Sequence, residues 1–335
     1  MTRRQHLAAA DFVPLAREAV GGHRTLAAAT RLTGGSRKGV YRLAFDDDST
    51  VIAYVWSPQE DYWARPASDV TDSLSDATGP GLFRSAHARL TALGVRVPRL
   101  LLLDEDAVHL PAYAAVVEDV TGGTLEDALR DDPARARPAV RRLAETLRVL
   151  RSCTAAGHGE VTLVEEGGTP LAADCAQATA DHALRDIDEL CVRDPRVAAV
   201  QDRLRERVRR LRHALAPRDT CSLVHGELGP DHVLLTPGGE PVLIDIEGLK
   251  YFDAEGEHAF LELRFGPWYD MLRAPGLDED RMALHRLAVR LSLVAGPLRL
   301  LDGDWPDPAP MRAVAEANLR WVLASAGRDG TAPGA

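Results

Sequence analysis

Two acids and two imidazoles are closely spaced in the segment LVHGELGPDHVLLTPGGEPVLIDIEG, residues 223–248. His225 and Glu227 follow an apolar run, His232 precedes a second one, and Asp245 ends a third. Carboxylates bind hard cations, and a carboxylate can also accept a proton from a hydroxyl group. Placing such groups beside apolar strands is costly unless they bind a cation or handle a proton. The segment therefore predicts a site rather than an ordinary surface hairpin.

The chain offers very few lysines to such a site. Arginine supplies nearly all of the positive charge, and Lys38 and Lys250 are the only lysines in the sequence. Lys38 follows a glycine-bearing turn, in which Gly34 and Gly35 precede an alternating apolar strand. Lys38 is therefore the only lysine side chain before residue 250.

The elements that would position these residues form a strand-rich front and a helical back. Residues 10–30 predict a short amphipathic helix and a loop, and residues 32–54 predict a hairpin around the Asp-rich turn at 46–48. Further strands are expected at 99–103 and 112–118. Helical periodicity is found at 82–93, 139–155, 171–191, 196–214, 278–294 and 310–325. Strands followed by helices indicate two lobes, residues 1–118 and 119–326, with a disordered tail at 327–335.

The bulk composition narrows the class of protein. A net charge of −10 argues against nucleic acid as a partner, because phosphate binding needs a basic surface. No stretch approaches the roughly 20 apolar residues of a membrane span, and residues 1–20 lack the apolar core of a signal peptide. The four cysteines are widely spaced, form no CxxC pair and are expected to be reduced. We therefore expect a cytoplasmic protein that binds neither nucleic acid nor a membrane.

The central segment resembles the aminoglycoside phosphotransferase and choline kinase family, a branch of the protein-kinase-like fold. That family has a loop H-G-D-x-x-P-x-N, followed after a short hairpin by a strand that ends in I-D-W-E or similar. Here the loop reads His225-Gly-Glu-Leu-Gly-Pro-Asp-His232, and the strand end reads Ile244-Asp-Ile-Glu247. The resemblance covers residues 30–320. It implies an α+β, protein-kinase-like two-lobed fold with a small antiparallel-sheet N-lobe and a helical C-lobe.

The resemblance also implies roles for the residues of the loop and the strand end. Asp245 matches the aspartate that holds magnesium on the nucleotide phosphates, and Glu247 matches a second acid that assists the metal. Glu227 stands where the family has the catalytic aspartate, which orients and deprotonates the acceptor hydroxyl. His225 matches a histidine that mainly supports the loop, and His232 replaces a metal-binding asparagine. Since histidine suits manganese better than magnesium, the implied cofactors are ATP with Mg²⁺ or Mn²⁺.

A nucleotide site follows from the resemblance as well. The family's phosphate-covering loop corresponds to Gly34, Gly35, Ser36, Arg37, Lys38 and Gly39. Glu118 and Val120 fall in the hinge that binds adenine through its backbone. Tyr54 occupies the position of the family's phosphate-binding lysine, so Lys38, or Arg37 beside it, is expected to reach the phosphates instead.

These departures leave two functions open, from different classes. In the first, the chain is an ATP-dependent kinase for a hydroxyl of a small molecule, such as an aminoglycoside or another natural product. Its acceptor could also be a Ser or Thr of a biosynthetic peptide, with a lyase as partner protein. In the second, the chain is a pseudokinase, a scaffold that binds a nucleotide or a partner. Acids at both 227 and 245 favour the enzyme, because buried carboxylates need a function or a partner.

Overall fold

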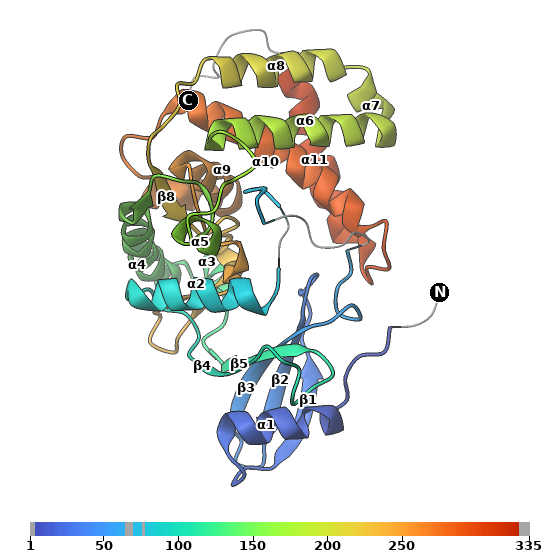
Figure 1. Ribbon diagram of the computed structural model, residues 1–335, viewed down its shortest axis with the longest axis vertical. Helices are drawn as coiled ribbons and strands as arrows, with labels where there is room; N and C mark the ends of the chain where they lie inside the picture. The colour runs from blue at the N-terminus through green and yellow to red at the C-terminus, as the bar shows by residue number, and fades with distance from the viewer. Residues whose placement is uncertain (1–3, 64–69, 76–77, 328–335) are drawn as a thin grey trace. The chain divides into compact units, whose positions relative to one another are not determined.

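A computed structural model describes residues 4–63, 70–75 and 78–327 (Figure 1). The chain forms two compact units. The first comprises Met1–Arg65, Ala77–Thr146 and Gly229–Gly248, and the second comprises Pro66–Asp76, Leu147–Leu228 and Leu249–Ala335. The first unit thus extends beyond the lobe boundary predicted at residue 118, and it includes the hairpin that ends in Asp245. Most of the predicted disordered tail, from residue 328 onward, lies outside the described residues.

The first unit is built on a five-stranded antiparallel sheet with the order β1-β2-β3-β5-β4. Alternating apolar residues of β2 place Tyr41 and Leu43 against Phe12 and Leu15 of the N-terminal helices, where all four are buried. The strands are β1 (Leu26–Arg31), β2 (Gly39–Phe45), β3 (Thr50–Trp56), β4 (Leu100–Asp104) and β5 (Tyr113–Glu118). The predicted hairpin and the two further strands are confirmed, whereas β1 lies where a loop was expected.

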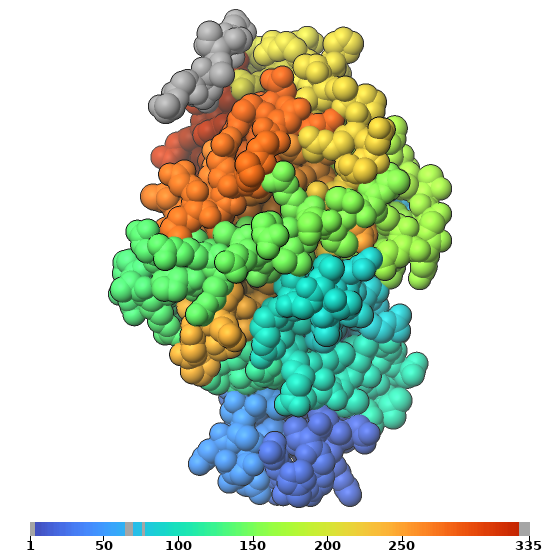
Figure 2. Space-filling model, turned by 90° about the vertical axis from the view of Figure 1, so that its left-hand side faces the viewer, coloured from blue at the N-terminus to red at the C-terminus, as the bar shows by residue number. Residues whose placement is uncertain are grey.

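Helices and a second hairpin complete this unit. In the hairpin, β9 pairs antiparallel with β10. A backbone hydrogen bond, from Leu235 N–H to the carbonyl of Gly123 at 2.8 Å, holds β9 against the segment that follows β5. The elements are η1 (Ala9–Phe12), α1 (Val13–Val20), α2 (Pro80–Ala92), α3 (Leu125–Asp131), η2 (Pro230–His232), β9 (Val233–Leu235), β10 (Pro241–Leu243) and η3 (Ile246–Gly248). Helix α4 (Pro133–Ser152) lies at the surface shown in Figure 2, and many of its arginines are exposed.

The second unit is mainly helical. Helix α10 packs against α6, α9 and α11, and the buried apolar faces of α6, α8, α10 and α11 form one core (Figure 1). A small sheet with the order β6-β8-β11-β7 lies in the same unit. The helices are α5 (Val161–Glu165), α6 (Cys175–Arg193), α7 (Pro195–Ala198), α8 (Gln201–His213), α9 (Ala254–Phe265), η4 (Gly266–Met271), α10 (Glu279–Leu300) and α11 (Pro308–Ala326), and the strands are β6 (Thr154–Ala155), β7 (Gly159–Glu160), β8 (Cys221–Val224) and β11 (Lys250–Phe252).

The observed architecture confirms the predicted fold class of an antiparallel sheet followed by a helical region. One predicted helix is wrong in detail, because residues 196–214 form two helices, α7 and α8, rather than one. Asp194 caps α7 by accepting from the N–H of Arg196, and the chain starts a new helix at Gln201. All four cysteines are free thiols, as predicted. No described helix is long and apolar enough to cross a membrane.

Candidate active site

The ammonium group of Lys38 lies between two carboxylates of the 229–248 segment in the first unit. Its Nζ donates to Asp245 Oδ1 at 2.7 Å and also to Glu247 Oε1. The side chains of Lys38 and Glu247 are 10% and 7% exposed, whereas that of Asp245 is 46% exposed. One buried cation therefore joins the glycine-bearing loop to both acids that the sequence marked as metal ligands.

The backbone around Asp245 explains how the two acids come together. Asp245 follows β10 with a φ of 57°, a left-handed conformation that aspartate tolerates better than most residues. Just before it, the N–H of Ile244 donates to the carbonyl of His232 at 3.0 Å, which fixes the end of the hairpin. Strained backbone conformations concentrate at functional sites. The hairpin end thus has the features of a site and not only those of a turn.

The loop that carries Lys38 is folded back on itself. A Cβ added at Gly35 would lie 2.3 Å from the carbonyl oxygen of Lys38, so only glycine fits there. Next to Lys38, the Arg37 guanidinium lies 3.5 Å from Asp61 and stacks over the ring of Trp63. The Trp63 indole also donates to Ser36 Oγ at 3.1 Å. Of the two candidate cations, Lys38 therefore faces the acids and Arg37 faces the 57–63 segment.

Electrostatics keep Lys38 charged. Burial opposes the charge, yet attraction from Asp245 and Glu247 outweighs it, and the pKa of Lys38 is raised. The ring of Tyr54 lies 5.3 Å from Lys38 Nζ and adds a cation–π contact. Burial raises the pKa of Tyr54 itself, so its hydroxyl stays neutral. Tyr54, the strand residue expected at the position of the family's lysine, thus contacts Lys38 of the loop.

A buried glutamate behind this loop ties the N-terminal segment to the sheet. Glu60 accepts hydrogen bonds from the Tyr41 hydroxyl, from Arg31 Nε at 2.8 Å and from the His6 ring at 3.1 Å. Arg4 donates to three carbonyls of the 57–63 segment and stacks 4.2 Å over the ring of Tyr62. Glu60 is not predictable from the sequence, because nothing local distinguishes it from an exposed loop glutamate.

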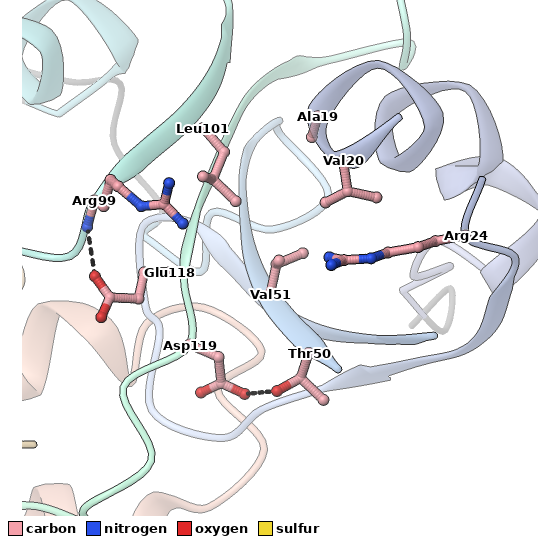
Figure 3. Close-up of a pocket in the computed structure, with 9 residues that line it drawn as sticks. All are labelled: Ala19, Val20, Arg24, Thr50, Val51, Arg99, Leu101, Glu118 and Asp119. Atoms are coloured by element: carbon pink, nitrogen blue, oxygen red, sulfur yellow. Dashed lines mark hydrogen bonds between the residues drawn. The ribbon is translucent and has the colours of Figure 1, made fainter. Parts of the chain in front are cut away.

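Glu118 and Val120, the predicted hinge residues, lie at and just after the end of β5. Burial opposes the charge of Glu118, but hydrogen bonds from Arg96 at 2.6 and 2.7 Å lower its pKa. A pocket of about 310 Å³ opens beside this strand end, and Glu118 and Asp119 line it with Arg99 (Figure 3). The Lys38 cluster does not line this pocket. Val120 is buried at 7% exposure.

The residues present can hold a divalent cation. Asp245 and Glu247 supply hard carboxylate oxygens, and the Lys38 ammonium already stands where a cation is attracted. His232 Nε2 lies 3.6 Å from Asp245 Oδ2. Within the described residues, no group of three or more His, Cys, Asp or Glu side chains forms a preassembled metal site. The chemistry of the donors therefore fits a metal, provided that Lys38 moves away.

His225 and Glu227 belong to the second unit. His225 follows β8 and is fully buried, whereas Glu227 is exposed. The loop between them is held by Glu257 of α9, whose Oε2 accepts from Gly226 N–H at 2.8 Å. Burial raises the pKa of Glu257 to about 7. An anchored loop with an exposed carboxylate suits a residue that meets substrate, and Glu257 anchors this loop to α9.

The second lysine also has acidic neighbours. Lys250 of β11 is paired in register with Glu160 of β7, and its Nζ donates to the carbonyl of Ser73 at 2.8 Å. Burial raises the pKa of Glu160 to about 7, and Lys250 reduces this effect. In the same unit, burial lowers the pKa of His258 to about 4. Glu160 lies in a two-residue strand, which is too short to be recognised in the sequence.

The comparisons with known proteins settle the family. Residues 81–261, more than half of the chain, match the model of the phosphotransferase enzyme family, APH. The chain belongs to this family. This confirms the resemblance drawn from the loop and the strand end. A comparison with curated proteins gives no match.

Several solved structures share the fold. LicA in complex with AMP is similar with a TM-score of 0.62 and 14% identity, over 96% of this chain and 100% of that one. A thermostable mutant of aminoglycoside phosphotransferase APH(4)-Ia, in ternary complex with ADP and hygromycin B, is similar with a TM-score of 0.58 and 15% identity. That similarity covers 95% of this chain and 99% of the other. At these identities the likeness establishes the fold alone.

Proposed function

We propose that this chain is an ATP-dependent phosphotransferase that moves the γ-phosphate to a hydroxyl of a small molecule or of a Ser or Thr in a biosynthetic peptide. The observation that carries the proposal is the contact of Lys38 with Asp245 and Glu247. This contact joins a cation suited to phosphates and two carboxylates suited to a metal, in a chain of a phosphotransferase family. The nucleotide complexes of similar structures support ATP as the donor, and a complex with hygromycin B supports a small-molecule acceptor.

In the proposed reaction, the acceptor oxygen forms a bond to the γ-phosphorus, and the bond from this phosphorus to the β,γ-bridging oxygen breaks, releasing ADP. Glu227 orients the acceptor hydroxyl and takes its proton, and His225 supports the loop that holds Glu227. Gly34, Gly35 and Ser36 offer backbone N–H groups to the phosphates.

The other residues of the proposed site bind the nucleotide and its metal. Asp245 and Glu247 would hold Mg²⁺ or Mn²⁺ with His232 nearby, and such an ion neutralises charge on the phosphates. Lys38 is the phosphate-binding cation, since Arg37 is engaged by Asp61. Tyr54 would border the nucleotide next to Lys38, and Glu118 and Val120 would border it at the end of β5. A cytoplasmic location suits an enzyme that uses ATP.

A substitution at Asp245 tests this function. We expect ATP with Mg²⁺ or Mn²⁺ to stabilise the wild-type chain by about 2.7 kcal/mol at about 100 times the dissociation constant. Asp245→Asn should lose this stabilisation and ATP turnover while the fold survives, because the side chain is half exposed and asparagine tolerates a positive φ. Asp48→Asn is the matched control, since Asp48 has a φ of 62° in an exposed turn. Thermal unfolding with and without ATP and metal measures both variants.

The second candidate function is a pseudokinase scaffold, working with a partner protein such as a lyase. It is favoured by Tyr54 at the strand position and by Lys38, which satisfies both acids without a metal. A wild-type chain that shows no thermal shift with ATP and either metal would refute the enzyme and leave the scaffold.

A further inference from the structure

We infer that Lys38 is the resident cation of the Asp245–Glu247 site, so that the chain accepts a divalent metal tightly only when nucleotide phosphates draw Lys38 away. This inference rests on the proposed function and concerns the order in which the site is filled. It assigns Lys38 two positions, one on the acids and one on the phosphates.

The contacts show that Lys38 uses the oxygens that a metal would need. Its Nζ donates to Oδ1 of Asp245 and to Oε1 of Glu247, so the ammonium bridges the two residues. The Glu247 and Lys38 side chains are almost fully buried, and water screens their attraction weakly. A metal arriving alone would therefore have to expel a charge that is already well placed.

The charges explain why phosphates would change this balance. Two carboxylates and one ammonium leave a net charge of about −1, so the acids still attract a cation. The expelled ammonium would lose its partners, unless the phosphates offered new ones. Lysine binds phosphate as a point charge on a flexible stem, and it can exchange one anion for another. Bound nucleotide would therefore free the two carboxylates from Lys38, and its phosphates would supply further oxygen ligands for the metal.

The surroundings of Lys38 are built for such an exchange. Lys38 follows glycine-rich residues 34 and 35, whereas its neighbour Arg37 is held by Asp61 and by the ring of Trp63. Tyr54 contacts the Lys38 ammonium with the face of its neutral ring, so this contact adds no negative charge. A lysine at position 54 would instead bring a second positive charge to the place where Lys38 now lies.

The test is Mn²⁺ binding without nucleotide, measured by the loss of the free Mn²⁺ signal in electron paramagnetic resonance. We expect the wild-type chain to bind Mn²⁺ with a dissociation constant above about 1 mM, which corresponds to a binding free energy weaker than ~4 kcal/mol. Lys38→Met should bind at least about tenfold more tightly, a change of ~1.4 kcal/mol. Arg37→Met is the matched control and should bind like wild type. Adding Asp245→Asn to Lys38→Met should abolish the gain.

Two results would overturn the inference. One is tight binding of Mn²⁺ by the wild-type chain without nucleotide, at a dissociation constant below about 50 µM, a measurement that needs no variant. The other is a folded Lys38→Met chain with no gain, or with a gain that persists after Asp245→Asn. Because no nucleotide is present, these results are independent of the ATP-induced stabilisation that tests the proposed function.

Discussion

The free energy that couples Lys38 to Glu247 can be isolated with Lys38→Met, Glu247→Gln and the double variant. An ammonium and a carboxylate in contact at about 3 Å attract by about 5 kcal/mol at an effective dielectric constant of about 20. Desolvation of two nearly buried side chains offsets part of this attraction. We therefore expect a coupling of about 2–3 kcal/mol in the free energy of unfolding. Methionine keeps the length and apolar stem of lysine, so the cycle reports mainly on charge.

Urea unfolding in buffer with EDTA and no nucleotide, followed by circular dichroism, measures this coupling. Hydrogen exchange of peptides from residues 229–248 assigns the change to the first unit, in case the two units unfold separately. The cycle of Lys38→Met with Asp245→Asn is the matched control. Asp245 is 46% exposed, so its coupling should be only about 0.5–1 kcal/mol. A Glu247 coupling below about 0.5 kcal/mol, or one smaller than that of Asp245, would refute the burial argument.

Two further predictions concern buried acids of the second unit. The pKa of Glu160 is raised from 4.5 to about 7, so the unfolded chain loses this proton first and stability falls as pH rises through that window. Glu160→Gln should therefore raise the free energy of unfolding in urea by up to about 3 kcal/mol more at pH 8 than at pH 5. The exposed control Glu166→Gln should show no such difference between the two pH values. An equal gain of Glu160→Gln at both pH values would contradict this prediction. Asp253 is 1% exposed and binds Arg281 at 2.9 Å, so Asp253→Asn should cost about 3–5 kcal/mol. The exposed control Asp219→Asn should cost little in the same assay, and similar losses for both would argue against a buried ion-pair role.

The sequence was sufficient to predict the elements with strong periodicity and the acids at their ends. Strand β2 has an alternating pattern, β3 is a nearly continuous apolar run, and α10 and α11 have long helical patterns, so local rules apply to them. Asp245 was singled out because it follows an apolar run, and Glu247 was singled out by the family resemblance. Counting lysines also singled out Lys38, since no other lysine precedes residue 250.

The remaining features depend on contacts that no local pattern encodes. Lys38 and Asp245 are 207 residues apart in sequence, and their contact depends on how the loop and the hairpin pack in the first unit. Strand β1 is rich in alanine, which favours helices, and it forms a strand because it pairs with β2. Glu60 lies in a turn, and its role depends on Tyr41 and Arg31 meeting it from two different strands.

Arg4 and His6 form hydrogen bonds with the 57–63 segment, so residues 4–6 help to fix its position. Through Glu60 and Trp63, these residues support the turn that carries Ser36 and Lys38. Removing residues 1–6, or fusing a bulky tag to them, would therefore loosen the loop that carries Ser36 and Lys38. If this loop binds phosphates as proposed, the affinity for nucleotide would fall without any substitution in residues 34–38.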